Sequence, residues 1–191
     1  MIQKALYTHF TDYLETYPTH TLYGIFDGVK CPRLWSDLEE GILEYDMLFR
    51  EEELRRELES VAPYLVKLDF QSEADIEQSK ACLQWYEENG CIFMATEVDF
   101  ATLLASMREL FYVYTPEGEQ GFMRFYDPSV FRDYITQKDD NIRYALFSEV
   151  VCYWCEDAKD ISVVHQYTKD STYTHLEKNI DLTKKELLKD V

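Results

Sequence analysis

Two cysteines at Cys-x-x-Cys spacing, Cys152 and Cys155, are the first candidates for chemistry in this chain of 191 residues. In redox enzymes such a pair opens a helix, whose N-terminus lowers the pKa of one thiol. Here the pair ends an apolar run and precedes Glu156 and Asp157, whose negative charges favour a raised thiol pKa. A zinc site needs two further ligands, for which His165 is the nearest candidate. We therefore favour two structural thiols over metal binding and over redox chemistry.

The other reactive residue types form no recognisable active site in the sequence. None of the four histidines lies in a His-x-x-x-His or His-Glu-x-x-His frame: His9, His20, His165 and His175. The six glycines form no phosphate-binding loop, dinucleotide-binding loop or nucleophile elbow. Adjacent carboxylates such as those at 51–53 do not share a helix face, so we interpret the acidic clusters as solvated surface. We expect no enzymatic activity, no cofactor, no metal and no small-molecule substrate.

The formal net charge is −18, from 37 acidic and 19 basic residues. Binding to phosphate backbones or anionic membranes depends on Lys and Arg, so we expect neither nucleic acid nor a membrane as partner. The excess charge either is plain solvated surface or steers basic partners. Five cysteines at irregular spacing are typical of reduced cytosolic thiols. Because no apolar run is long enough for a membrane helix and the start lacks a signal peptide, we expect a soluble cytoplasmic protein.

Hydropathy patterns predict helices interleaved with strands. Helices are expected near 2–17, 32–38, 51–60, 74–89, 100–111 and 129–135, and strands near 21–27, 43–49, 63–68, 91–95 and 120–126. This order predicts an α/β fold, with a mixed β-sheet flanked by helices, over residues 1–135.

Residues 136–191 form a C-terminal segment of uncertain structure, which we expect to pack on that core. Its patterns are compatible with a strand pair at 150–154 and 161–168, followed by a mostly polar helix at 176–188. Because this segment lacks the motifs described next, we expect it to determine partner specificity.

The stretch Phe-Met-Arg-Phe-Tyr-Asp-Pro at 122–128 contains two structural signals. Its first five residues alternate between two faces, which predicts a strand. Asp127 then offers a side-chain oxygen to the free N–H groups of a helix start, and Pro128 fixes φ at the first helical position. We predict a strand that runs directly into a helix capped by Asp127.

Four motifs occur in a fixed order: Leu-Tyr-Gly-Ile-Phe-Asp-Gly at 22–28, Leu-Phe-Arg at 48–50, Ala-Pro-Tyr-Leu-Val at 62–66 and Arg-Phe-Tyr-Asp-Pro at 124–128. With these motifs the chain resembles the bacterial domain-of-unknown-function 4123 family over residues 22–135. For Arg124, pairing with an acidic neighbour is favoured over contact with a partner. We expect the motif residues to maintain the fold: Pro63, Tyr64, Arg124, Phe125, Tyr126, Asp127 and Pro128.

The resemblance implies a function based on binding alone. Members of that family look like cytoplasmic adaptor chaperones of type VI secretion, which load a toxic effector onto a VgrG-type spike protein. The expected partners are therefore one secreted effector and the spike. Aromatic residues suit protein interfaces, and the candidates in the C-terminal segment are Tyr153, Trp154, Tyr167 and Tyr173.

The alternative is an acidic immunity or inhibitor protein that neutralises a basic toxin domain by charge complementarity. This alternative explains the net charge of −18 but not the ordered motifs.

Overall fold

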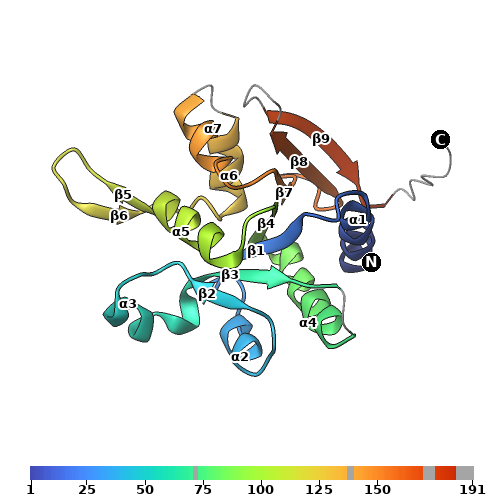
Figure 1. The fold of residues 1–191 in the computed structure, drawn as a ribbon, viewed down its shortest axis with the longest axis horizontal. Helices are drawn as coiled ribbons and strands as arrows, with labels where there is room; N and C mark the ends of the chain where they lie inside the picture. Colours follow the sequence, from blue (N-terminus) through green and yellow to red (C-terminus); the bar gives the residue numbers. More distant parts are fainter. Residues whose placement is uncertain (71–72, 137–139, 170–174, 184–191) are drawn as a thin grey trace.

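The computed structural model describes residues 1–70, 73–136, 140–169 and 175–183. Its centre is a seven-stranded sheet in the order β2-β3-β1-β4-β7-β8-β9 (Figure 1). The strands are β1 (Thr21–Asp27), β2 (Tyr45–Met47), β3 (Pro63–Leu68), β4 (Cys91–Thr96), β7 (Cys152–Glu156), β8 (Val163–Lys169) and β9 (His175–Asp181). The predicted class, an α/β fold with a sheet flanked by helices, is confirmed.

Helices cover both faces of the sheet. The adjacent residues Tyr153 and Trp154 of β7 point to opposite faces, as neighbours in a strand must. Trp154 meets Phe10 of α1 with ring centroids 5.3 Å apart, whereas Tyr153 meets Phe131 of α6 at 4.9 Å. The first face carries α1 (Ile2–Thr16), α4 (Glu73–Leu83) and the 3₁₀ helix η2 (Gln84–Glu88), and the second carries α5 (Phe100–Phe111), α6 (Pro128–Ile135) and α7 (Asp140–Leu146). The short helices α2 (Leu34–Glu39), α3 (Glu52–Glu57) and η1 (Glu59–Val61) lie in the connection between β1 and β3.

The strand pairings differ from the mixed arrangement that the sequence predicts. Every pairing in the described residues is antiparallel. The unit β3–α4–β4 does cross over and bring two strands into the same direction, as strand–helix alternation predicts. However, β1 lies between β3 and β4 and runs opposite to both, so the two parallel strands do not touch. The prediction that 91–95 is a central, buried strand is confirmed, because β4 is the fourth strand of seven and fully buried.

The strand predicted at 120–126 is too long. Among the described strands, β6 (Gln120–Phe122) pairs only with β5 (Tyr112–Tyr114) in a separate hairpin, which turns at Gly118 with φ 88°. The chain then leaves the extended conformation, and Phe125 and Tyr126 are both buried, 0% and 6% exposed. Residues 125 and 126 form a turn, closed by the amide of Asp127 donating to the carbonyl of Arg124 at 3.0 Å, and this turn brings Asp127 to the start of α6. The helix predicted after Asp127 is confirmed as α6.

The C-terminal segment adds strands to the same sheet. The predicted pair near 150–154 and 161–168 is confirmed as β7 and β8. The predicted helix at 176–188 is wrong over its first part, which forms β9, and residues 184–191 lie outside the described part. The open edge of β8 offers hydrogen bonds to residues 175–181, and this pairing overrides their weak helical pattern. Because β7 pairs with β4, the sheet continues across the predicted boundary after residue 135.

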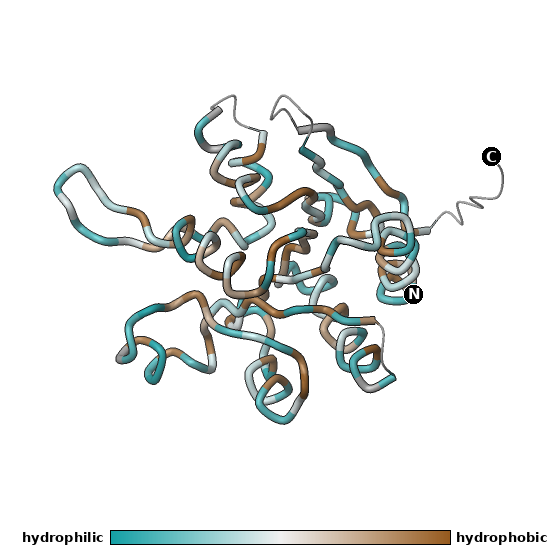
Figure 2. The backbone as a smooth tube through the Cα atoms, viewed as in Figure 1, coloured by the Kyte–Doolittle hydropathy of each residue, from teal (hydrophilic) through white to brown (hydrophobic). Residues whose placement is uncertain are grey.

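The core follows the middle of the sheet. Figure 2 shows the most hydrophobic stretches along the central strands, whereas the tip of the β5–β6 hairpin is hydrophilic. Among the described helices, none combines the length and the apolar composition needed to cross a bilayer.

Candidate functional site

Three of the four sequence motifs meet at one corner of the sheet. The end of β1, the start of β3 and the start of α6 lie together, and the amide of Gly28 donates to the carbonyl of Ala62 at 3.1 Å. A Cβ atom on Gly28 would lie 2.5 Å from that carbonyl oxygen, so only glycine permits this approach. We call the four ionised side chains gathered here the charged corner: Asp27, Lys30, Arg124 and Asp127.

The principal ion pair of the charged corner joins Asp27 to Arg124. A guanidinium nitrogen of Arg124 lies 2.6 Å from Oδ2 of Asp27, and the amide of Val29 donates to Oδ1 at 3.0 Å. The Asp27 side chain is 3% exposed and the Arg124 side chain 50% exposed. Burial, the largest single effect, would lower the pKa of Arg124, but the charge and hydrogen bond of Asp27, together with contributions from Tyr126 and Asp127, outweigh burial and raise the pKa. The pairing of Arg124 with an acidic neighbour, favoured from the sequence, is confirmed.

Asp127 fixes the start of α6 and closes the charged corner. Its Oδ1 accepts from the amide of Ser129 at 3.0 Å, as an N-cap residue does. Its Oδ2 lies 3.0 Å from the ammonium of Lys30 and 3.5 Å from Arg124. Burial alone would raise the pKa of Asp127, but the hydrogen bonds from Ser129 and Lys30 lower it. The predicted capping role of Asp127 is confirmed.

The remaining motif residues surround this corner or support it from the core. Tyr126 is buried beside the Arg124 guanidinium, which lies 5.9 Å from its ring centroid. Burial, together with the charge of Asp27, raises the pKa of Tyr126 to about 12. Tyr64 is buried and donates to the carbonyl of Glu59 at 2.6 Å. Pro63 begins β3, Phe125 lies in the core, and Pro128 is the first residue of α6.

The charged corner is suited to structure and binding rather than to proton transfer. All four carboxylate oxygens of Asp27 and Asp127 already have a cationic, amide or hydroxyl partner. Both carboxylates are therefore fixed in place by the ion pairs and by the helix cap. The side chain of Arg124, which is 50% exposed, is the most accessible of the four, followed by that of Lys30 at 31%.

Sequence reasoning missed Lys30, which lies 97 positions before its partner Asp127. A lysine in a polar loop gives no local signal of such a contact. Asp27 was identified only as the residue that ends a strand.

Three of the four aromatic residues predicted to bind a partner lie in the core. Tyr153 and Trp154 are 0% exposed and Tyr167 is 2% exposed. A partner would reach these rings only if the helices moved off the sheet. Tyr173 lies outside the described residues.

The Cys-x-x-Cys pair lies within β7. Residues three positions apart in a strand point to opposite faces, so the two thiols of Cys152 and Cys155 face away from each other. All five cysteines are buried, and burial raises the pKa of the Cys152 thiol to about 12. No group of three or more metal-binding side chains occurs among the residues that the structure describes. This arrangement is that of structural thiols.

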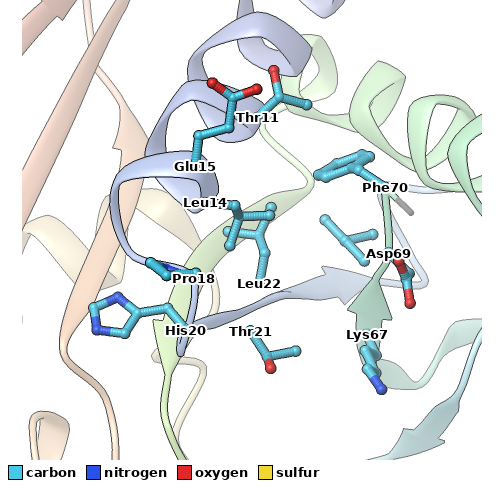
Figure 3. Close-up of a pocket in the computed structure, with 11 residues that line it drawn as sticks. Thr11, Leu14, Glu15, Pro18, His20, Thr21, Leu22, Lys67, Asp69 and Phe70 are labelled. Atoms are coloured by element: carbon cyan, nitrogen blue, oxygen red, sulfur yellow. The ribbon is translucent and has the colours of Figure 1, made fainter.

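Two open clefts lie at the opposite end of β1 from the charged corner. The first has a volume of about 470 Å³ and lies between α1, β1 and β3 (Figure 3). Figure 3 shows the carboxylate of Glu15 and the ammonium of Lys67 at opposite ends of this cleft, with Leu14 between them. The second cleft, of about 450 Å³, shares Thr21 and Lys67 with the first. Both clefts are open to solvent.

Comparison with known proteins identifies a family for the part of the chain that contains the charged corner. No curated protein and no solved structure matches the chain. The model of the family described as "Domain of unknown function (DUF4123)" matches residues 22–143, more than half of the chain. The match includes Asp27, Lys30, Arg124 and Asp127 and ends before β7. The chain therefore belongs to the DUF4123 family.

Proposed function

We propose that this protein is a non-enzymatic, cytoplasmic adaptor that binds one secreted effector and loads it onto the VgrG-type spike of a type VI secretion system. The observation that carries the proposal is membership of the DUF4123 family, together with the meeting of three of the four sequence motifs at the charged corner. The family resemblance supplies the type of activity, which is binding alone.

The chemistry of the described residues supports a role in binding. The corner carboxylates are engaged in ion pairs and in a helix cap, and the thiols are buried with raised pKa values. Large apolar side chains are nevertheless exposed on the β5–β6 hairpin, among them Tyr114 and Phe122. Aromatic side chains are enriched at protein–protein interfaces, so these exposed rings support a role in binding another protein.

Co-purification and secretion assays test this proposal. The tagged protein should bind both a VgrG-type spike protein and the full-length toxin encoded beside its own gene. Deletion of the gene should stop secretion of that toxin alone, while other effectors continue to be secreted. If neither protein binds and secretion is unchanged, the proposal is wrong.

The net charge of −18 favours a second candidate, an immunity protein that blocks a basic toxin domain. Such a protein should bind the isolated catalytic domain, protect cells that lack the secretion machinery, and leave secretion unchanged. Its affinity should fall steeply with salt, because screening weakens contacts between exposed charges. An adaptor whose contacts are mainly aromatic should show a smaller response.

A further inference from the structure

The β5–β6 hairpin forms a small two-stranded sheet that is separate from the main sheet. It connects α5 to α6 in the chain and projects from the body beyond the end of α5, and neither of its strands joins the seven-stranded sheet (Figure 1). Its base is held by the amide of Met123, which donates to the carbonyl of Phe111 at 2.8 Å, and its far end by the amide of Thr115, which donates to Glu119 at 2.9 Å. The hairpin is therefore an ordered extension and not an irregular loop.

One face of the hairpin is aromatic. Tyr112 lies opposite Phe122, and Tyr114 lies opposite Gln120, so these four side chains share a face. Phe122 is supported from below, with its ring centroid 4.9 Å from that of Phe111 and 5.3 Å from that of Phe49. It nevertheless remains 44% exposed, and Tyr114 is 68% exposed. Two large rings on a supported platform are thus available to a partner.

The outer edge of β6 offers unpaired backbone groups. In an antiparallel pair, hydrogen-bonded positions alternate along each strand. The bonded positions here are 111/123 and 115/119, so the N–H and C=O groups of Gln120 and Phe122 point away from β5. Within the described part of the chain, β6 has β5 as its sole strand neighbour. Such an edge is a template for a further strand.

The charge around this face is predominantly negative. Glu117 and Glu119 are exposed at the far end of the hairpin, and Glu51 lies at the margin of the aromatic face. Glu51 remains ionised, because a hydrogen bond from Tyr112 lowers its pKa. One exposed cation, Arg50, lies over Tyr112 with its guanidinium 5.1 Å from the ring centroid. The face therefore complements a segment that carries Lys or Arg beside apolar residues.

We infer that the hairpin holds a short, extended, basic segment of the effector as a third strand along the edge of β6. The segment's backbone pairs with Gln120 and Phe122, its apolar side chains pack on Tyr114 and Phe122, and its cations meet the glutamates. Strand addition of this kind combines backbone affinity with side-chain specificity. The inference rests on the proposed adaptor function and identifies the surface that performs it.

Removal of the aromatic side chains tests the platform. Binding of the purified, full-length chain to the catalytically inactivated, full-length toxin encoded beside it is measured by calorimetry. Tyr114→Ala and Phe122→Ala should each weaken the affinity about tenfold or more, as central aromatic contacts do. Tyr144→Ala, which removes an aromatic side chain 58% exposed on α7, is the matched control and should bind like the parent. Tyr114→Ala keeps the test valid if Phe122→Ala lowers stability, because Phe122 packs on two rings.

A proline substitution separates backbone pairing from side-chain contact. Gln120→Pro removes an N–H that points outward, a position where an edge strand tolerates proline. Gln120→Ala removes the same side chain and keeps the N–H. If a third strand forms, the proline variant should bind the toxin several-fold more weakly than the alanine variant. Equal affinities would exclude strand addition at this edge.

Charge reversal and spike binding complete the test. Glu117→Lys with Glu119→Lys should weaken toxin binding, and the loss should diminish at high salt. All hairpin variants should still bind the VgrG-type spike protein at parental affinity. If the parent binds the toxin and the variants bind it equally well, or lose the spike instead, the hairpin inference is wrong and the adaptor function stands. If the parent binds neither protein, the adaptor function fails and the inference fails with it.

Discussion

Arg124 lies 2.6 Å from Asp27, a residue 97 positions earlier in the chain, and this ion pair joins the start of α6 to the end of β1. Asp27 is almost fully buried, whereas half of the Arg124 side chain is exposed. The pair therefore combines a buried charge that needs its partner with a cation that reaches the surface.

Removal of Arg124, whose partner carboxylate is buried, should destabilise the protein more than removal of an arginine whose partner carboxylate is exposed. Arg124→Leu leaves the buried carboxylate of Asp27 without its cation, so we expect a loss of about 1–3 kcal/mol of unfolding free energy. Arg56→Leu breaks an exposed pair with Glu52 and should cost less than about 0.5 kcal/mol. Urea unfolding of both variants measures the difference, and equal losses would contradict the importance of the Asp27 pair.

Asp127 should contribute both a helix cap and a charge. Asp127→Ala removes the acceptor for the Ser129 amide and should cost about 0.5–2 kcal/mol, and Asp127→Asn should cost less, because Asn also caps. The lowered pKa of Asp127 means that its stabilising contribution is present above its unfolded pKa and is lost as pH falls through the folded value. Melting curves at several acidic pH values test this, and a variant that melts like the parent but binds no partner would instead make Asp127 a contact residue.

The close approach at Gly28 should make this position intolerant of alanine. A Cβ atom there would lie 2.5 Å from a backbone oxygen, so Gly28→Ala should lower the unfolding free energy by about 1–3 kcal/mol through overpacking. Gly121→Ala is the control, because its Cβ would meet Val113 at an ordinary 3.6 Å. In thermal melting, the Gly121→Ala variant should have a clearly higher melting temperature than the Gly28→Ala variant.

Glu156 should make the protein less stable as pH rises toward neutrality. Its side chain is 1% exposed, one carboxylate oxygen lacks a hydrogen-bond partner among the described residues, and burial raises its pKa from 4.5 to about 7. The folded state therefore holds this proton more tightly than the unfolded state, and stability falls between these two pKa values. Glu156→Gln should remove this dependence and gain stability at about pH 8, whereas the exposed Glu87→Gln should leave the profile unchanged. A parental pH profile in Glu156→Gln would show that Glu156 is ionised in the fold.

The thiols should be unreactive in the native protein. All five cysteines are buried, and burial raises the pKa of the Cys152 thiol to about 12, so little nucleophilic thiolate forms at neutral pH. A thiol reagent should modify the native protein slowly and the denatured protein fully. Metal analysis of tag-free, reduced protein should find no stoichiometric zinc, and zinc that disappears in Cys152→Ser with Cys155→Ser would contradict the structural interpretation.

Local patterns were sufficient to predict elements whose signals lie within a few residues. The boundaries of β1 and β3 follow from continuous apolar runs, and the cap at Asp127 follows from the residue types that accept helix N–H groups. In contrast, the insertion of β1 between β3 and β4 depends on packing of distant segments and leaves no mark on any single stretch.

The candidate site could be predicted only in part for the same reason. The sequence identified Arg124 and Asp127, but their partners Asp27 and Lys30 lie 97 positions away from them. Aromatic residues suit a core and an interface equally well, so Trp154 gave no signal that it would be buried. The exposed ring of Phe122 lies in the stretch 120–126, whose alternating pattern predicts a strand and gives no sign that the strand lies outside the main sheet.

The position of β4 has a consequence for dissection of this family. The matched residues 22–143 include β4 but omit β7, its neighbour on one side, and α1, whose Phe10 covers Phe93 of β4. A fragment cut at those limits would present the buried backbone edge of the central strand to solvent, where it can pair with other copies. We therefore expect such a fragment to aggregate, so that the smallest unit able to fold extends well beyond the segment by which the family is recognised.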